Sequence, residues 1–244
     1  MLRFEELAFD DTPMGELTLR HRHESAVGAE VYEVKLGEEY LMSSLFTVAE
    51  EELTRLGLAA VPGDAPLDVL VGGLGLGYTA VTAYEDARIR SLTVVDALPE
   101  VIRWHERRLL PVSATLVDDA RTALVHHDFF ALMRGEPGGL EGGPAQWDAI
   151  LLDVDHTPTF TLDPSHADLY TEAGLQRLAR HLTARGVFAL WSDDEPDEGF
   201  LETLRAVFAE VEGHVVEFPN PVTGGTSSNG VYVARAPRAA RASA

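Results

Sequence analysis

The chain has 244 residues and contains no cysteine, a single lysine and no long apolar run. The absence of cysteine excludes disulfides, thiolate metal sites and a cysteine nucleophile. No stretch reaches the ~18–20 apolar residues that are needed to cross a bilayer. The first residues lack the basic and apolar regions of a signal peptide. We therefore expect a cytoplasmic protein with no membrane partner.

Positive charge is scarce, because 19 Lys and Arg residues face 40 Asp and Glu residues and the formal net charge is −21. This balance argues against nucleic-acid binding, which needs a basic surface. It could attract small cations to a cleft, although a solvated acidic surface is the simpler explanation for most of these charges. The length and the 45% content of hydrophobic residues fit one α/β domain with a small appendage.

Strands alternate with helices from residue 67 onward, which predicts a doubly wound parallel sheet of the Rossmann-like methyltransferase type. We expect a small N-terminal β-strand domain at 1–45, a nucleoside-binding catalytic domain at 46–236 and a flexible tail at 237–244. Thr47 and Glu50 form a capping-box pattern at the start of a helix over 47–58. Further helices are predicted at 78–86, 99–110, 129–135, 166–182 and 197–211. The glycine-rich segment 135–144 is predicted to be a loop at the sheet edge opposite the site.

Four glycines follow the first strand of this alternating region, namely Gly72, Gly73, Gly75 and Gly77. Glycine allows a tight turn and a close approach to a ligand, and the next helix offers free N–H groups and its positive dipole end. A strand before and a helix after are the context in which such a loop binds a nucleotide. A close-packed turn without a ligand is the alternative. We predict that the loop lines a nucleoside site.

Acidic residues end the next two strands. Asp96 ends the second strand, where a carboxylate can accept hydrogen bonds from both hydroxyls of a ribose. Asp128 ends the third strand, and with Phe129 it suits the exocyclic amine and the ring face of an adenine. One such residue alone would be more typical of a helix cap. Their succession indicates an adenosine.

The fourth strand ends in Asp153, Asp155 and His156. Open α/β sheets bind ligands at the carboxyl ends of their strands, although these carboxylates could instead cap or stiffen the loop. Our hypothesis is that Asp153 binds an attacking amine and accepts its proton. Asp155 would add electrostatic support and His156 would pass the proton outward.

An acidic cluster at 193–198 follows the fifth strand, and Asp193 could bind the far end of a polyamine. Favourable charge at the start of the next helix is the alternative explanation. Tyr170 and Trp191 could form walls of an acceptor pocket, or they could be core residues. The cluster lacks the loop spacing of a calcium site, so we predict no metal.

The order of these motifs resembles the spermidine synthase (polyamine aminopropyltransferase) family, which shares its catalytic-domain fold with AdoMet-dependent methyltransferases. The similarity covers about residues 7–235. It implies that Gly73 and Gly75 line the nucleoside site. It also implies that Asp96 holds the ribose, Asp128 holds the adenine and Asp153 is the catalytic aspartate. A homodimer or homotetramer is a further implication.

Several segments depart from the family pattern. Gly75 stands where the family has an aspartate near the aminopropyl amine of the donor, which gives a more methyltransferase-like GxGxG. The family's DE-x-x-Y-x-E signature reads SSLFTVAEE, in which only Glu50 or Glu51 could replace its glutamate. DSSDP is replaced by residues 153–158, and the late Tyr-Pro-Ser-Gly stretch by NPVTGGTSSNG.

The sequence leaves three functions open, of which we favour the first. The first is transfer of an aminopropyl group from decarboxylated AdoMet to a di- or polyamine, a small cationic amine that suits an acidic site. The second is methyl transfer from AdoMet to a small amine or another nucleophile, which Gly75 favours. The third is a non-catalytic binder of nucleosides or polyamines, against which Asp153 argues.

Overall fold

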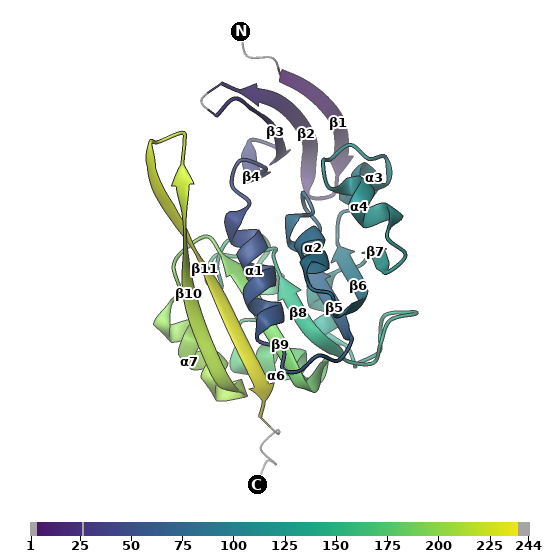
Figure 1. The fold of residues 1–244 in the computed structure, drawn as a ribbon, viewed down its shortest axis with the longest axis vertical. Helices are drawn as coiled ribbons and strands as arrows, with labels where there is room; N and C mark the ends of the chain where they lie inside the picture. Colours follow the sequence, from purple (N-terminus) through teal and green to yellow (C-terminus); the bar gives the residue numbers. More distant parts are fainter. Residues whose placement is uncertain (1–3, 26, 239–244) are drawn as a thin grey trace.

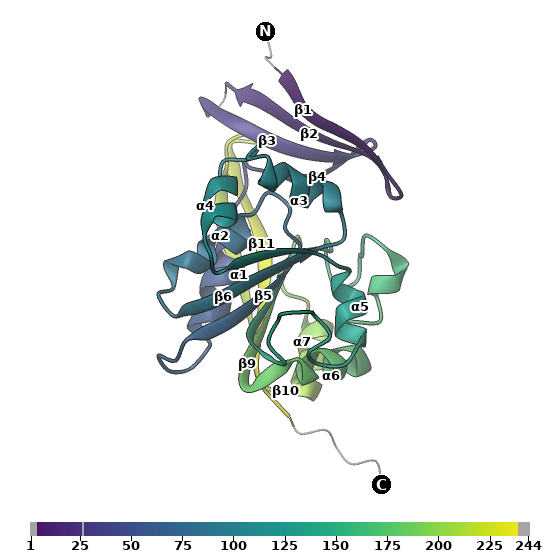
Figure 2. The same ribbon diagram turned by 90° about the vertical axis from the view of Figure 1, so that its right-hand side faces the viewer.

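The computed structural model describes residues 4–25 and 27–238, which form two sheets (Figure 1). The smaller sheet is antiparallel, with its strands in sequence order. Its strands are β1 (Phe4–Thr12), β2 (Gly15–Glu24), β3 (Ala29–Leu36) and β4 (Glu39–Ser43). Leu17, Leu19 and Val34 are buried on one face. This face covers one end of the larger domain (Figure 2).

The larger sheet has seven strands in the order β10-β11-β9-β8-β5-β6-β7. Five of them run parallel, and the β10–β11 hairpin is antiparallel to its neighbour β9. The strands are β5 (Leu67–Gly72), β6 (Ile89–Asp96), β7 (Thr122–His126), β8 (Trp147–Leu152), β9 (Leu182–Ser192), β10 (Phe208–Asn220) and β11 (Gly225–Pro237). Strand β5 pairs with β6 on one side and β8 on the other, so the winding direction reverses there. Such a reversal opens a crevice at the carboxyl ends of the strands.

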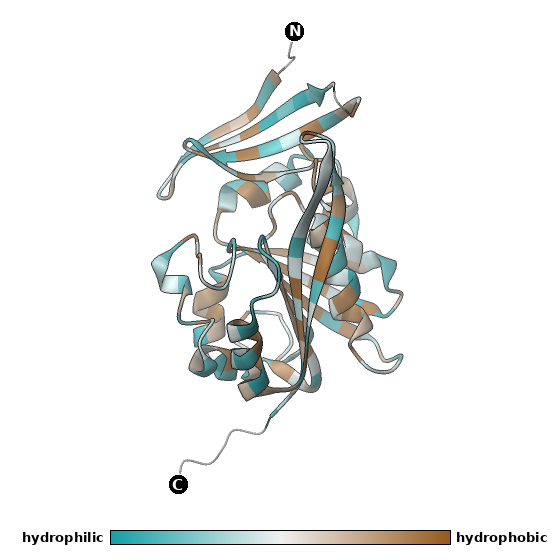
Figure 3. Ribbon diagram, turned by 90° about the vertical axis from the view of Figure 1, so that its left-hand side faces the viewer, coloured by the Kyte–Doolittle hydropathy of each residue, from teal (hydrophilic) through white to brown (hydrophobic). Residues whose placement is uncertain are grey.

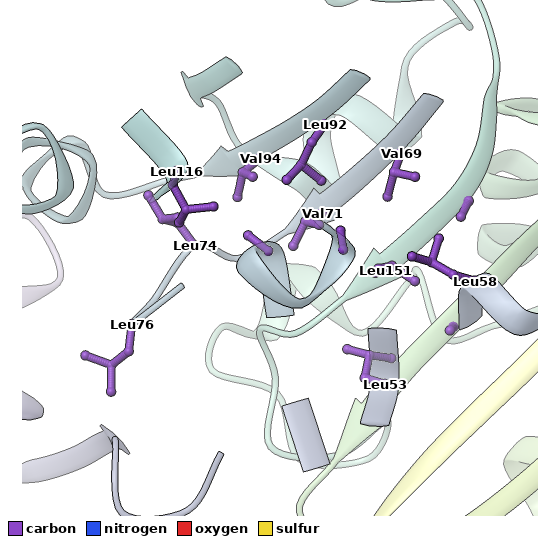
Figure 4. Close-up of a cluster of buried hydrophobic side chains, with 14 of the residues drawn as sticks. Leu53, Leu58, Val69, Val71, Leu74, Leu76, Leu92, Val94, Leu116 and Leu151 are labelled. Atoms are coloured by element: carbon purple, nitrogen blue, oxygen red, sulfur yellow. The ribbon is translucent and has the colours of Figure 1, made fainter. Parts of the chain in front are cut away.

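Helices cover both faces of this sheet. They are α1 (Val48–Ala59), α2 (Tyr78–Thr82), α3 (Pro99–Glu106), α4 (Ser113–Asp118), α5 (Phe129–Arg134), α6 (Glu172–Arg180) and α7 (Glu198–Val207). Val69 and Val71 of β5 pack with α1 and its neighbours (Figure 4). Leu70 packs on the other face of the sheet with α5, α6 and α7. Figure 3 shows hydrophobic residues where helices meet the sheet. The predicted doubly wound α/β class is therefore confirmed.

Several predicted element boundaries were wrong. Helix α2 ends at Thr82 and continues as a 3₁₀ turn, and α4 was not predicted. The segment expected to be helical over 166–182 begins as a 3₁₀ turn, and α6 starts only after Thr171, whose hydroxyl caps it. Strand β10 begins at Phe208, within a segment predicted to be helical, because this fully buried ring packs near Phe188. Tertiary burial overrides local propensity at this point.

The predicted capping box at α1 was also wrong. The Thr47 side chain makes no capping bond, and its hydroxyl donates to a carboxylate oxygen of Glu51 at 2.9 Å. The Glu50 side chain does not take part in a capping box. Of the tail predicted at 237–244, Pro237 ends β11, Arg238 donates to the Val207 carbonyl, and residues 239–244 lie outside the described residues. Within the described part of the chain, no helix is long and apolar enough to span a membrane.

Helix α1 approaches the sheet most closely at Gly57. A Cβ built there would lie 2.7 Å from Leu151 Cδ2 and 3.1 Å from Ala189 Cβ. We predict that Gly57→Ala destabilises the protein by about 1–2 kcal/mol, because overpacking against two strands outweighs the ~1 kcal/mol that alanine gains in a helix. Denaturant unfolding measures this change. Val48→Ala, at an exposed position of the same helix, is the control; a stabilised Gly57→Ala variant would contradict the close packing.

Candidate active site

Two cavities meet at the carboxyl ends of β5 and β8. The first, here named the β6–β7 cavity, has a volume of about 310 Å³ and extends to the carboxyl ends of β6 and β7. The second, here named the hairpin cavity, has a volume of about 510 Å³ and lies under residues 218–229 of the β10–β11 hairpin. The two share lining residues, which are Leu41, Met42, Gly75, Asp153, Val154 and Leu162. A ligand in one cavity would therefore touch a ligand in the other near Asp153.

The glycine loop lies between the two cavities. Gly73 lines the β6–β7 cavity, Gly75 lines both and Gly77 lines the hairpin cavity. Gly73 has a φ of +93°, and a Cβ there would lie 2.0 Å from the Asp153 carbonyl oxygen, so only glycine fits. Gly72 lines neither cavity. Its Cα packs against the Phe129 ring, and this corrects the prediction that Gly72 contacts the ligand.

Gly75, the departure noted in the loop, has a structural explanation. Its φ is +45°, and a Cβ would lie 2.9 Å from the Sδ atom of Met42, which projects from β4. Met42 therefore occupies the space that a side chain at position 75 would need. The Gly75 carbonyl accepts a hydrogen bond from the buried His105, whose Nε2 lies 2.9 Å away. The His105 contact holds the loop from outside the cavities, whereas Met42 lines both of them.

Asp96 lines the β6–β7 cavity at the end of β6. Its two carboxylate oxygens accept hydrogen bonds from the backbone N–H groups of Leu74 and Leu98, at 2.9 and 2.8 Å. Burial raises the pKa of Asp96, and the backbone donors oppose this shift. The backbone N–H of Gly75 also stabilises the charged form of this carboxylate. A carboxylate has about four acceptor positions, so one remains that can accept a bond from a ribose hydroxyl.

Asp128 lines the same cavity but is also the N-cap of α5. Its Oδ1 accepts hydrogen bonds from the backbone N–H groups of Phe130 and Ala131, and its Oδ2 lies 3.7 Å from an Arg134 nitrogen. Phe129 is only 4% exposed, and its ring forms part of the cavity floor. Asp128 thus combines the two roles that the sequence left open, a helix cap and a cavity carboxylate.

Asp153 and Glu50 place two carboxylates at the junction of the cavities. Asp153 accepts a hydrogen bond from the Thr79 hydroxyl at 2.6 Å. Burial raises the pKa of Asp153 to about 6, against the lowering effect of this bond. Burial, together with the negative charge of Asp153, raises the pKa of Glu50 to about 8. Near neutral pH the pair therefore shares one proton.

Glu50 was not predicted to be a site residue. From the sequence it is only one of two residues that could replace the family's glutamate. It lies in the first turn of α1 and lines the hairpin cavity with Tyr78 and Asp153. No strand-end rule points to it, because it comes from a helix that precedes the first parallel strand. An acidic residue in a helix that begins directly after the small domain was the available signal.

Asp155 does not take the predicted place in the site. It is 1% exposed and lines neither cavity. Its oxygens accept hydrogen bonds from the Leu162 N–H at 2.7 Å, from His166 Nδ1 at 2.8 Å and from the Tyr170 hydroxyl at 2.7 Å. Asp155 therefore holds the loop after β8 together and cannot contact a substrate, which corrects its predicted catalytic and binding roles.

Tyr170 was predicted as a wall of the acceptor pocket, and this was wrong as well. Its ring is 7% exposed and packs against Phe130 and Phe200, away from both cavities. Burial raises the pKa of its hydroxyl well above the ordinary value, so the group remains a donor to Asp155. Trp191, the other predicted wall, does line the hairpin cavity.

The acidic cluster at 193–198 divides between both of its predicted roles. Asp193 lines the hairpin cavity with His156, and its Oδ1 accepts a hydrogen bond from the Asn229 amide at 3.0 Å. Asp197 caps α7 and Glu198 pairs with Arg205 on the surface of that helix. Only Asp193 is therefore available to a ligand in the cavity.

The charged side chains that line the two cavities are acidic. Among the described residues that line them, none is Lys or Arg, whereas Glu50, Asp96, Asp128, Asp153, Asp163 and Asp193 are acidic. His156 lines the hairpin cavity, and its buried Nε2 lies 3.4 Å from a carboxylate oxygen of Glu39. Residues 4–25 and 27–238 contain no cluster of His, Asp and Glu that is arranged to hold a metal ion. The site favours a cationic ligand.

Comparisons with known proteins point in the same direction. No protein-family model matches the chain. It is 29% identical to polyamine aminopropyltransferase 2 of Pseudomonas aeruginosa over 168 residues, which are 66% of this chain and 45% of that protein. The chain thus spans less than half the length of this curated relative. The resemblance drawn from the sequence motifs is confirmed.

Solved structures show the same fold. A spermidine synthase from Thermotoga maritima superposes with a TM-score of 0.71 and 18% identity, covering 96% of this chain and 79% of that one. A spermidine synthase in complex with the transition-state analogue AdoDATO gives 0.70 and 17%, covering 96% and 80%. Human methyltransferase-like protein 13, in complex with SAH, gives 0.56 and 22%, covering 80% and 85%. The architecture is thus common to aminopropyl- and methyltransferases.

The raised pKa of Glu50 leads to a prediction about stability. In the folded protein Glu50 binds its proton more tightly than in the unfolded chain, whose pKa is near 4.5, so stability falls as the pH rises from about 4.5 to about 8. Glu50→Gln removes this loss. We predict a melting temperature that exceeds the wild-type value at about pH 9 and approaches it at about pH 5.

The matched control for this prediction is Glu51→Gln. Glu51 is the next residue of α1, and its carboxylate bonds to Thr47 and Arg55 on the surface. We expect no gain in stability at high pH from this variant. Thermal unfolding of the three proteins across the pH range decides the matter, and a Glu50→Gln effect that does not change with pH would contradict the buried pair.

Proposed function

We propose that this chain transfers an aminopropyl group from decarboxylated AdoMet to a small di- or polyamine. The observation that carries the proposal is the Glu50–Asp153 carboxylate pair at the junction of two cavities that lack cationic side chains. The β6–β7 cavity offers Asp96 and Asp128 to the nucleoside, and the hairpin cavity receives the acceptor amine. The similarity to a polyamine aminopropyltransferase supports this assignment.

The reaction is a single displacement. The amine nitrogen attacks the aminopropyl carbon that is bonded to the sulfonium, the C–S bond breaks, and sulfur keeps the electron pair as a neutral thioether. The acceptor arrives as an ammonium with an ordinary pKa of ~10.4 and must lose a proton before it attacks. Asp153 lies where it can bind this group and accept the proton, with Glu50 as a second carboxylate beside it. His156, which lines the same cavity, would pass the proton onward.

Alignment of the two substrates provides the other part of the catalysis. Both are cations, and their mutual repulsion would oppose a close approach in a neutral cavity. A carboxylate at ~4 Å from a cation contributes ~4 kcal/mol at an effective dielectric of ~20, before desolvation is subtracted. A near-attack geometry can supply up to ~7–11 kcal/mol in favourable models. Asp153 belongs to both cavities and can therefore act on both partners at once.

Methyl transfer from AdoMet is the second candidate, since Gly75 resembles a methyltransferase loop. The structure gives Gly75 another explanation, namely its contact with Met42. The carboxylate of AdoMet would also meet Glu50 and Asp153, with no Lys or Arg among the described lining residues to balance it. Decarboxylation of the donor removes this repulsion, so the geometry favours the aminopropyl donor.

We also propose that the chain forms a homodimer or homotetramer through its N-terminal sheet. Phe4 and Phe9 of β1 are 55% and 52% exposed, and Tyr40 of β4 is 58% exposed. Apolar side chains exposed in this number on a small sheet are typical of an interface. Light scattering measures the mass in solution, and a monomer would refute the proposal.

The proposed reaction predicts the effect of Asp153→Asn. This variant keeps the shape of the site but cannot accept a proton, so we expect turnover to fall by about 10²–10⁴-fold while the affinity for the nucleoside changes little. Mass spectrometry follows product formation with either donor and a panel of diamines and polyamines, and calorimetry follows nucleoside binding. Glu51→Gln again serves as the control.

Each outcome of this assay has a distinct meaning. A gain of aminopropyl mass with the decarboxylated donor alone supports the proposal, and a gain of methyl mass with AdoMet supports the second candidate. Near-normal turnover by Asp153→Asn excludes this residue as the base. Nucleoside binding by the wild type without any product across the panel favours the non-catalytic binder.

A further inference from the structure

The loop that follows β8 carries a histidine whose position is set by a buried carboxylate. Asp155 accepts bonds from the Leu162 N–H, from His166 Nδ1 and from the Tyr170 hydroxyl, as described above. A carboxylate can only accept, so the proton of the His166–Asp155 bond lies on Nδ1. In the neutral form of the ring, the second nitrogen of His166, Nε2, carries a lone pair that can accept a hydrogen bond.

The ring of His166 is also fixed in its plane. It stacks on Phe130 with 3.6 Å between the ring centroids and 8° between the planes. The His166 side chain is 14% exposed and lines the β6–β7 cavity. Within residues 4–25 and 27–238 no protein group bonds to its Nε2. The orientation of the ring is fixed and its Nδ1 is bonded to Asp155, so its Nε2 is available to form a hydrogen bond with a ligand.

The position of His166 in the cavity indicates which part of a nucleoside it meets. Phe130, on which it stacks, is two residues beyond Asp128 at the end of β7. Asp96, the ribose candidate, ends the neighbouring strand β6. His166 therefore lies at the β7 end, where the base is expected. Asp128 uses Oδ1 for two backbone N–H groups and has Oδ2 left for the base. An exocyclic amine has two N–H groups, so it can bond to a second acceptor as well.

We propose that His166 is a base-recognition residue, whose Nε2 accepts a hydrogen bond from the exocyclic amine of the adenine. This inference rests on the proposed function only in that the ligand is an adenine nucleoside. It does not require turnover, and it holds for either donor. Asp155 acts through His166 as a positioning residue, which gives a role to the acidic residue that does not reach the substrate.

The test compares two nucleosides on three proteins. The probes are 5′-methylthioadenosine, the neutral product of aminopropyl transfer, and 5′-methylthioinosine, which carries an oxygen in place of the exocyclic amine. The variants are His166→Asn, whose amide N–H can still donate to Asp155, and His166→Gln, whose longer amide reaches toward the Nε2 position. Isothermal titration calorimetry gives the dissociation constants.

We expect the wild type to bind the adenosine at least about tenfold more tightly than the inosine, the effect of one hydrogen bond. His166→Asn should lose about tenfold in affinity for the adenosine and little for the inosine, and His166→Gln should recover part of the loss. Equal losses for both nucleosides in His166→Asn would show that the residue only supports the loop and would overturn the proposal. An unchanged preference in this variant would overturn it too.

Failure of this inference differs from failure of the proposed function. If the wild type binds both nucleosides equally well, His166 does not bind the exocyclic amine as proposed. The proposals for the donor site and for the reaction are then unaffected. If the wild type binds neither nucleoside, the donor site itself is wrong and both proposals fail. A wild-type preference for the inosine would show a protonated, donating ring and would also reject the acceptor role.

Discussion

The site depends on the contact between two chain segments at the reversal of strand order. The Asp153 N–H donates to the Gly72 carbonyl at 2.8 Å, and the Asp153 carbonyl lies where Gly73 would carry a Cβ. Any side chain at Gly73 would separate the ends of β5 and β8. Because they meet, Asp153 comes to lie between the cavity at the ends of β6 and β7 and the cavity under the hairpin. A residue in this position can act on two ligands that meet at the sheet edge.

The second carboxylate comes from the other side of the crevice and carries a cost. Helix α1 approaches the sheet at Gly57, and its first turn brings Glu50 beside Asp153. Partial burial, together with the mutual repulsion of the two carboxylates, makes the folded protein bind a proton more tightly than the unfolded chain does. A hydrophobic pair would be more stable at high pH. The retained repulsion is typical of functional sites, where stability is exchanged for a poised proton acceptor.

Strand-end reasoning placed Asp96, Asp128 and Asp153 at the cavities, because parallel strands deliver their carboxyl ends to one edge. The same reasoning failed for Asp155, since a rule about strand ends does not say whether a side chain turns toward the crevice or into the loop. The prediction that Tyr170 forms a wall of the acceptor pocket was wrong because its hydroxyl donates to the buried carboxylate of Asp155. Glu50 was beyond this reasoning, because its place depends on how a helix outside the alternating pattern packs. Local patterns gave the sheet, and tertiary packing decided which polar groups face a ligand.

Charge gives the remaining argument about specificity. A donor that carries a carboxylate needs a cation or free N–H groups, and among the described lining residues neither cavity offers Lys or Arg. A donor without that carboxylate presents only positive charge to Glu50 and Asp153. In the proposed reaction the acceptor is also cationic until Asp153 takes its proton. Each cation therefore reduces the mutual repulsion of the carboxylates, and the carboxylates reduce the repulsion between the two cations. Binding of either cationic substrate would stabilise the ionised carboxylates and so lower the pKa of the pair. The carboxylates would then be weaker bases when the substrates are bound. Proton release from the acceptor must then be helped by its alignment with the sulfonium, whose positive charge favours the free amine.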